Sequence, residues 1–403
     1  MKFFKKYWID LLVVVLSFFF LYFFVVVRAP ICMDEFSQYH PIICAHYEGN
    51  KLNIFREACG MYDLKIPGTE TFLPLRSYGY GGSLSSLLYY PFFLIWQSPY
   101  SARAIGFLFV LIQAYFLSKL LRFKFRNALL GIVLFFPYIY QILIDTGIIQ
   151  FYTTAIIMIV YFTQQWFSTF KNRYIYLTGF FLFLLFFARL SFGFGFPALM
   201  AIFIYFGIRN YDNWRRRWKS MLMAGIVAVI IMIIPSALYL FSIGNDGTQQ
   251  IVAELTTKSV SHTLVEMLNP RTYIDSIILR RFLNPLEATD RGFVMGNINI
   301  IGLIYSFILF GVPLIFFVKS FIEKKILKRV MVRFNYLSMI FYLAFILTCF
   351  FLFKTESSRF MHHAMMAYPF LLLSWGFLIN DIKAITKNFF NILIVIFLGF
   401  NLF

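Results

Sequence analysis

The chain has 403 residues, of which 61% are hydrophobic and 13% are charged, and its mean hydropathy is +0.76. In soluble domains about a quarter of all residues are charged, so this composition excludes an ordinary soluble protein. The apolar residues fall in runs of about 17–25, the length that crosses roughly 30 Å of hydrocarbon. The sequence therefore predicts an all-α polytopic membrane protein.

We expect about 11 transmembrane helices. In chain order the apolar spans are 9–27, 101–121, 127–145, 148–166, 174–190, 192–208, 220–242, 297–318, 335–353, 363–380 and 389–403. The first span is predicted to be a retained helix and not a signal peptide, because Val25-Val26-Val27-Arg28 offers no small-residue cleavage site.

The net charge of +18 suggests a nucleic-acid partner at first sight. Topology explains it differently. If Lys2, Lys5 and Lys6 lie inside and the helices alternate, the inner connections carry an excess equal to the whole net charge, while the outer segments are neutral. This is the positive-inside distribution, so we predict a cytoplasmic N-terminus and no nucleic-acid partner.

The non-membrane residues are concentrated in two outer segments of a single transmembrane domain, 1–403. The first outer loop, 28–100, ends in an apolar, aromatic stretch from Leu84 to Trp96 that is too short to span and is typical of a surface helix. The second, 243–296, has a predicted turn at 245–247 (Asn-Asp-Gly). After that turn it has a loosely amphipathic helical pattern, which we interpret as short helices over the membrane face and a lid for the acceptor; the apolar positions are Leu264, Met267, Ile274, Ile277 and Ile278.

The acidic pair Asp34-Glu35 lies just beyond the first span, on the charge-neutral face. Acidic residues at the start of a helix are also ordinary helix caps, and that interpretation would account for Asp34 alone. The neighbouring polar residues from Phe36 to His40 favour a functional site at the membrane surface. A carboxylate there can act as a general base on an acceptor hydroxyl or amine.

Three features together resemble the GT-C superfamily of integral-membrane glycosyltransferases. They are the first helix followed by Asp34-Glu35, the segment Leu84-Ser85-Ser86-Leu87-Leu88-Tyr89-Tyr90-Pro91 with Ser101-Ala102-Arg103-Ala104-Ile105-Gly106, and the late segment from Ser358-Arg359-Phe360 to Tyr368-Pro369. The chain is most similar to the branch of the protein O-mannosyltransferases and lipid A aminoarabinose transferases. The resemblance covers roughly the first 125 residues and the stretch near 355–375.

This resemblance implies a hexosyl- or pentosyltransferase of the bacterial inner (plasma) membrane, acting on the periplasmic or outer face. The donor would be a sugar on a polyprenyl phosphate taken from the membrane lipid, and the acceptor a glycolipid, polysaccharide or protein. Asp34 would be the general base, and Glu35 would orient the acceptor. No cofactor and no metal are implied, and a metal ion is not favoured.

The leaving polyprenyl phosphate needs positive partners in a low-dielectric site. The candidates for binding the donor phosphate are Arg359, Arg189, Arg103 and Lys354, and the candidates for binding the acceptor or sugar are Tyr39, His40, Tyr89, His362 and His363. Other interpretations stay open: Arg359 as a snorkelling arginine, Arg103 as a helix anchor. Adjacent histidines on a helix point about 100° apart, which makes His362 and His363 poor joint ligands for one metal ion.

Two rival functions also stay open. A flippase for lipid-linked oligosaccharides would be expected to carry charges deep inside its spans. A polysaccharide polymerase or ligase would be expected to depend on the second outer loop, where His262, Arg271, Arg280 and Arg281 lie.

Of the four cysteines, Cys349 lies in a span and is predicted to be inert. Cys32, Cys44 and Cys59 permit one outer disulfide of undetermined pairing, or three free thiols. The glycines Gly193 and Gly195 are predicted to let helices approach closely.

Overall fold

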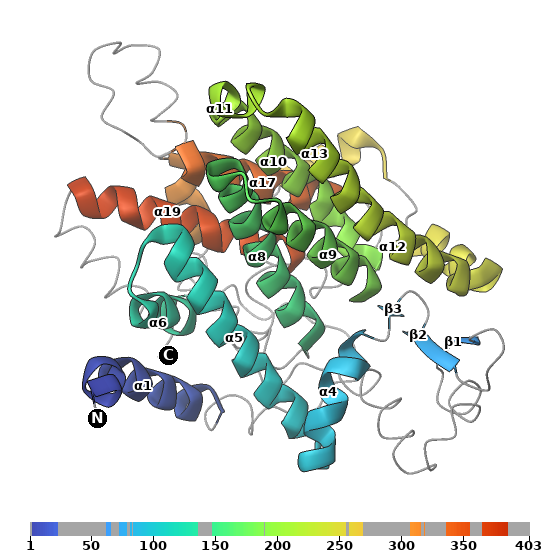
Figure 1. Cartoon of the computed structure of the whole chain (residues 1–403), viewed down its shortest axis with the longest axis horizontal. Helices are drawn as coiled ribbons and strands as arrows, with labels where there is room; N and C mark the ends of the chain where they lie inside the picture. The colour runs from blue at the N-terminus through green and yellow to red at the C-terminus, as the bar shows by residue number, and fades with distance from the viewer. Residues whose placement is uncertain are drawn as a thin grey trace.

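The described part of the protein is predominantly helical, which agrees with the all-α part of the prediction (Figure 1). The computed structural model describes residues 2–22, 62–65, 72–78, 81–82, 84–135, 147–188, 190–254, 258–268, 307–315, 318, 336–354 and 365–385. The helices are α1 (Lys2–Leu21), α4 (Leu84–Ile95), α5 (Pro99–Leu121), α6 (Phe125–Phe135), α8 (Gly147–Thr169), α9 (Asn172–Ala188), α10 (Phe196–Arg209), α11 (Tyr211–Arg215), α12 (Trp218–Glu254), α13 (Val260–Leu268), α17 (Tyr336–Phe353) and α19 (Tyr368–Ile385). Shorter turns of other helix types are η2 (Leu190–Gly195), η4 (Phe307–Gly311) and η6 (Met365–Ala367).

Two of the described helices are long and apolar enough to cross a membrane: Arg103–Leu121 within α5 and Trp218–Ala237 within α12. They differ in their surroundings, because 61% of the first window is buried within the protein and only 17% of the second. Shorter apolar helices are Tyr7–Leu21, Asn172–Ala188, Gly193–Arg209, Leu337–Phe353 and Tyr368–Asn380. The count of about 11 spans stays a prediction.

Neighbouring helices pack in the order α5, α8, α9 and α12. Helices α5 and α8 run parallel, because Phe109 contacts Phe151 and, further along both helices, Phe116 contacts Phe162, with ring centroids 5.8 and 5.6 Å apart. Helix α6 begins shortly after α5 and packs against it.

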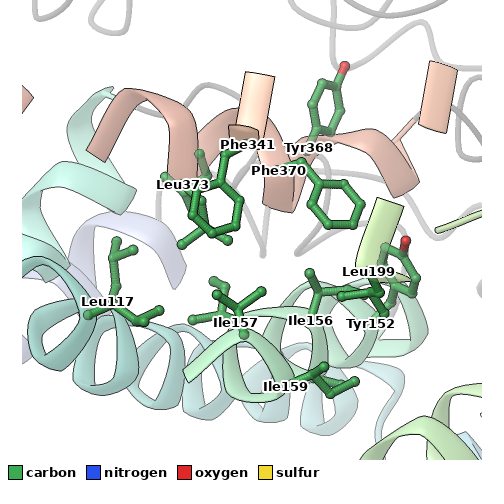
Figure 2. Packing of buried hydrophobic residues seen from close by; sticks show 14 of the residues in the cluster. Leu117, Tyr152, Ile156, Ile157, Ile159, Leu199, Phe341, Tyr368, Phe370 and Leu373 are labelled. Carbon is green, nitrogen blue, oxygen red and sulfur yellow. The ribbon is translucent and has the colours of Figure 1, made fainter. Parts of the chain in front are cut away.

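The hydrophobic core lies where α8 meets α17 and α19. Figure 2 shows Ile156 and Ile157 of α8 on one side of this core and Phe370 and Leu373 of α19 on the other, all fully buried. Ser338 of α17 and Ser374 of α19 join those two helices, because each hydroxyl donates to the backbone oxygen of the other residue, at 2.9 and 3.0 Å. A hydroxyl satisfied in this way can be buried in an apolar interface without an unpaired polar group.

The first outer loop contains a small sheet that the sequence analysis did not predict. Three antiparallel strands, β1 (Tyr62–Lys65), β2 (Phe72–Tyr78) and β3 (Gly81–Gly82), lie in the order β1-β2-β3. The β1–β2 register is interrupted between Tyr62 and Asp63, and Pro74 lies within β2. Short strands with a proline and an irregular register carry little periodic signal, so no clear alternation of apolar and polar residues marks them.

Helix α12 is longer than predicted and corrects one expectation. The sequence predicts that the span ends at 242 and that a turn follows at 245–247 (Asn-Asp-Gly), but the helix continues to Glu254. Its 37 residues correspond to about 55 Å at 1.5 Å per residue, well beyond the hydrocarbon thickness. Helix α12 contacts β1 and β2, and such packing can offset the cost of about 1 kcal/mol for each glycine inside a helix.

Both segments in which the sequence predicts short helices, the end of the loop 28–100 and the loop 243–296, contain a helix in the structure. Helix α4 covers Leu84 to Ile95, and it is followed by exposed Trp96. Its exposed side chains are apolar, namely Phe92, Leu94 and Ile95. Helix α13 covers Leu264 and Met267 of the amphipathic pattern, while Ile274, Ile277 and Ile278 lie outside the described residues.

Candidate functional site

Arg103 is the one predicted phosphate-binding residue whose surroundings the structure describes in detail. It lies in the first turns of α5, a helix that begins with Pro99 and is capped by Ser98, whose hydroxyl accepts a hydrogen bond from the Tyr100 backbone N–H at 3.3 Å. Ser101 donates its hydroxyl back to the Ser98 backbone oxygen at 2.7 Å. A serine cap followed by proline fixes the start of the helix and therefore the position of Arg103.

The Arg103 side chain is almost completely buried, with only 1% of its surface exposed. Its guanidinium carbon lies 5.5 Å from the centroid of the Tyr100 ring. The charge is also close enough to interact electrostatically with the Tyr22 hydroxyl at the end of α1. Burial at this level argues against the interpretation of Arg103 as an anchor that snorkels to the interface.

Aromatic contacts hold the end of α1 against the start of α5. The Tyr22 ring lies 6.2 Å from Trp96 and stacks on Phe18 at 5.1 Å, and Phe18 contacts Phe107 of α5 edge-on at 5.1 Å. We call this group the Arg103 junction; its residues are Phe18, Tyr22, Trp96, Tyr100, Arg103 and Phe107. The junction is aromatic and its charge is buried, so the local dielectric is low and the electrostatic interactions of the Arg103 guanidinium are stronger there than in water.

A second group of buried polar side chains was missed by the sequence analysis. The Gln113 amide nitrogen of α5 donates to the Gln150 side-chain oxygen at 2.9 Å and to the Thr154 hydroxyl at 3.0 Å, both on α8. Gln113 and Gln150 are at most 1% exposed. The signal was present in the sequence, because each glutamine interrupts an otherwise apolar run. Such interhelical bonds tie membrane helices together.

The prediction that Gly193 and Gly195 permit close packing is confirmed at Gly195. A Cβ atom at this position would meet the Tyr152 hydroxyl of α8, and it would lie 3.8 Å from the Phe370 ring of α19. Figure 2 shows Tyr152 and Phe370 on facing sides of the core. The turn η2 therefore packs against α8 and η6 where α10 begins.

Lys354 lies at a different helix end from Arg103. It follows the last residue of α17, and its backbone oxygen accepts a hydrogen bond from the Lys258 N–H at 2.8 Å, which ties α17 to the segment before α13. The structure therefore places these two predicted phosphate-binding residues at the ends of two different helices, α5 and α17.

The remaining predicted site residues are not placed. Tyr89 belongs to α4, and its side chain is not described. The others lie outside the described residues, namely Asp34, Glu35, Tyr39, His40, Arg189, Arg359, His362 and His363, as do Cys32, Cys44 and Cys59. Cys349 is a free, buried thiol, which agrees with its prediction as a packing residue.

Within the described ranges, no group of three or more His, Cys, Asp or Glu residues is arranged to hold a metal ion. The comparisons with known proteins found no matching family model, no similar curated protein and no similar solved structure.

Proposed function

We propose that this protein is a polytopic membrane glycosyltransferase of the GT-C type. It transfers a sugar from a polyprenyl-phosphate donor to a glycolipid, polysaccharide or protein acceptor at the outer face of a bacterial inner membrane. Support comes from the residues that resemble this superfamily, from the two long apolar helices, and from the apolar surface helix α4 beside α5.

The observation that carries the proposal is the position of Arg103. It is buried at the start of α5, beside Tyr22 at the end of α1. Only the segment 23–33 separates Tyr22 from the acidic pair Asp34-Glu35. The chain therefore enters the loop that holds the proposed base directly from the junction that holds a buried cation.

The proposed reaction uses both charges. Asp34 accepts the proton of the acceptor hydroxyl while the acceptor oxygen forms a bond to the anomeric carbon of the sugar. The bond between that carbon and the phosphate oxygen breaks, and its electron pair leaves with the polyprenyl phosphate. Arg103 stabilises the negative charge that develops on this phosphate, more strongly in an aromatic, low-dielectric site than in water.

The other predicted residues complete the proposed site. Glu35 orients the acceptor. Arg189, Arg359 and Lys354 supply further positive charge for the donor phosphate. The side chains assigned to acceptor or sugar binding are Tyr39, His40, Tyr89, His362 and His363.

The proposal also assigns a side of the membrane. Described basic residues gather at two turns that the positive-inside distribution assigns to the cytoplasm. The turn between α5 and α6, with the adjoining helix ends, has Lys119, Arg122, Lys124 and Arg126. The end of α11 and the start of α12 have Arg215, Arg216, Arg217 and Lys219. The start of α5, with the Arg103 junction, is at the opposite end of the helix and therefore faces outward.

The test is Asp34→Asn in proteoliposomes, with transfer of labelled sugar from a polyprenyl-phosphate donor as the readout. Removing a general base is expected to slow transfer by about 10²–10⁴-fold. Lys119→Gln serves as a control, because this residue is exposed at the other end of α5. Equal transfer by Asp34→Asn and wild-type protein contradicts the assignment of the base and turns attention to the second outer loop, as the polymerase or ligase alternative predicts.

A further inference from the structure

A cluster of exposed basic residues covers two turns at the end of the molecule opposite the Arg103 junction. The turn between α8 and α9 contributes two, and the α11–α12 region contributes the others; the basic cluster consists of Lys171, Arg173, Arg215, Arg216, Arg217 and Lys219. The one acidic residue of α11 is Asp212. Positive-inside topology explains why basic residues occur here, but it does not require them to be joined.

The two turns are joined by a direct contact. The Arg217 guanidinium carbon lies 5.2 Å from the centroid of the Phe170 ring, which belongs to the turn before α9. Phe170 has a φ of 56°, a backbone conformation that non-glycine residues rarely adopt. Arg173 lies over the Tyr174 ring at 4.9 Å and donates to its hydroxyl at 3.1 Å. Arg173 and Arg217 are therefore each held over an aromatic ring, and the Arg217 contact brings the start of α12 against the turn before α9.

Helix α12 continues this surface with side chains of a different kind. Trp218, with Lys219 5.8 Å from its ring, is half exposed at the start of the helix. After the exposed Lys219 and Ser220, the exposed side chains up to residue 234 are apolar, namely Leu222, Met223, Ile226, Val227, Val229, Ile230, Ile233 and Ile234. Only a narrow stripe with Met221, Ala224 and Ala228 is buried.

We propose that the basic cluster and the exposed face of α12 together form a binding site for an anionic phospholipid of the inner leaflet. The exposed side chains run from the arginines before α12, through Trp218 and Lys219 at its start, to apolar residues from Leu222 onward, which is the order of headgroup, interface and acyl chain in a bilayer. The arginines bind the phosphate of the headgroup, Trp218 lies at the interface, and the acyl chains follow the apolar face.

A lipid fits this surface better than an acidic protein segment does. An acidic segment would use the charges and leave the long apolar face of α12 uncovered, whereas a phospholipid covers both. The inference requires that α12 crosses the membrane, and it does not depend on the transferase activity.

The test measures lipid binding by the full-length protein in neutral detergent micelles. Fluorescent phosphatidylglycerol is titrated onto the wild type, onto Arg173→Gln/Arg217→Gln, and onto the control Lys119→Gln/Lys124→Gln. The control also removes two exposed positive charges, one from the last turn of α5 and one from the turn that follows it. Helical content by circular dichroism and elution by size exclusion establish that each variant is folded.

We expect phosphatidylglycerol to bind the wild type more tightly than phosphatidylcholine. The Arg173/Arg217 variant is expected to lose affinity by about fivefold for each removed charge, or roughly 25-fold in total, while the control stays within twofold of the wild type. An equal loss in both variants, or a loss in neither, overturns the site. Competition by polyglutamate or by the headgroup without acyl chains, at the affinity of the intact lipid, overturns the role of the apolar face.

Discussion

Two arginines make similar ring contacts but differ in their exposure to solvent. Arg103 at the start of α5 and Arg217 before α12 each lie over an aromatic ring, at 5.5 and 5.2 Å. Arg103 is 1% exposed, whereas Arg217 is exposed. A buried guanidinium must be compensated by the groups around it, while an exposed one keeps its water.

The number of positive charges in a region therefore does not locate the candidate phosphate-binding site in this protein. The described basic residues of the turns between α8 and α9 and before α12 are numerous and exposed, and we propose for them a role in topology and in lipid binding. The outer end has few described charges, but Arg103 there is held inside an aromatic junction. We therefore place the chemistry at the outer end and lipid binding at the inner end.

The largest effect among the described residues is expected from Arg103→Gln. If Arg103 stabilises the developing phosphate charge, its loss slows sugar transfer by about 10²–10³-fold, the effect of removing one preorganised donor. Initial rates at saturating acceptor measure this. Lys119→Gln removes a charge from the exposed end of the same helix and is expected to leave the rate within twofold of the wild type. A rate loss shared by both variants would remove the distinction between the buried and the exposed cation.

A substitution at Gly179 sharpens the comparison between the protein-facing and the outward-facing sides of α12. A Cβ atom on Gly179 of α9 would collide with the backbone oxygen of Ala228 and lie 3.1 Å from its Cα. Gly179→Ala is expected to destabilise the protein by about 1–3 kcal/mol, because a backbone clash forces α9 and α12 apart. Thermal unfolding in detergent measures this change.

Gly225 of α12 supplies the matched control, because a Cβ atom there would meet nothing within 4 Å. Gly225→Ala is expected to stabilise the helix by up to about 1 kcal/mol. Unfolding midpoints that move in the same direction for the two variants would contradict the assigned packing of α12.

The smallest effect is expected from the Gln113 and Gln150 pair. Interhelical hydrogen bonds in membrane proteins contribute about 0.6 kcal/mol on average. A double-mutant cycle with Gln113→Leu and Gln150→Leu is expected to give a coupling free energy of this size in equilibrium unfolding. A coupling near zero would show that this buried amide contact does not join α5 to α8.

Most helix positions could be predicted from the sequence, because long apolar runs directly reflect the spacing of buried and lipid-facing residues. The predicted span 101–121 corresponds to α5 at Pro99–Leu121, and 335–353 corresponds to α17 at Tyr336–Phe353. The sheet and the extension of α12 were not predicted. Both are set by contacts of β1 and β2 with α12, which join segments distant in the chain and leave no local periodicity.

The candidate site was predictable in residue type but not in burial. The sequence placed Arg103 at the edge of a span, where a helix anchor and a phosphate ligand are indistinguishable. The capped start of α5 and the packing of Tyr22 from α1 bury the side chain, which the sequence alone does not show. The glutamines at 113 and 150 were visible in the sequence, but their pairing depends on the parallel packing of α5 and α8.

The most direct test of the central claim is equilibrium binding of a labelled polyprenyl phosphate, the proposed leaving group, to wild-type, Arg103→Gln and Asp34→Asn proteins. The account predicts that Arg103→Gln weakens binding by at least about tenfold, the loss of one charge-assisted contact, while Asp34→Asn binds like the wild type although it no longer transfers sugar. Unchanged binding by Arg103→Gln would contradict the claim that the Arg103 junction holds the donor phosphate.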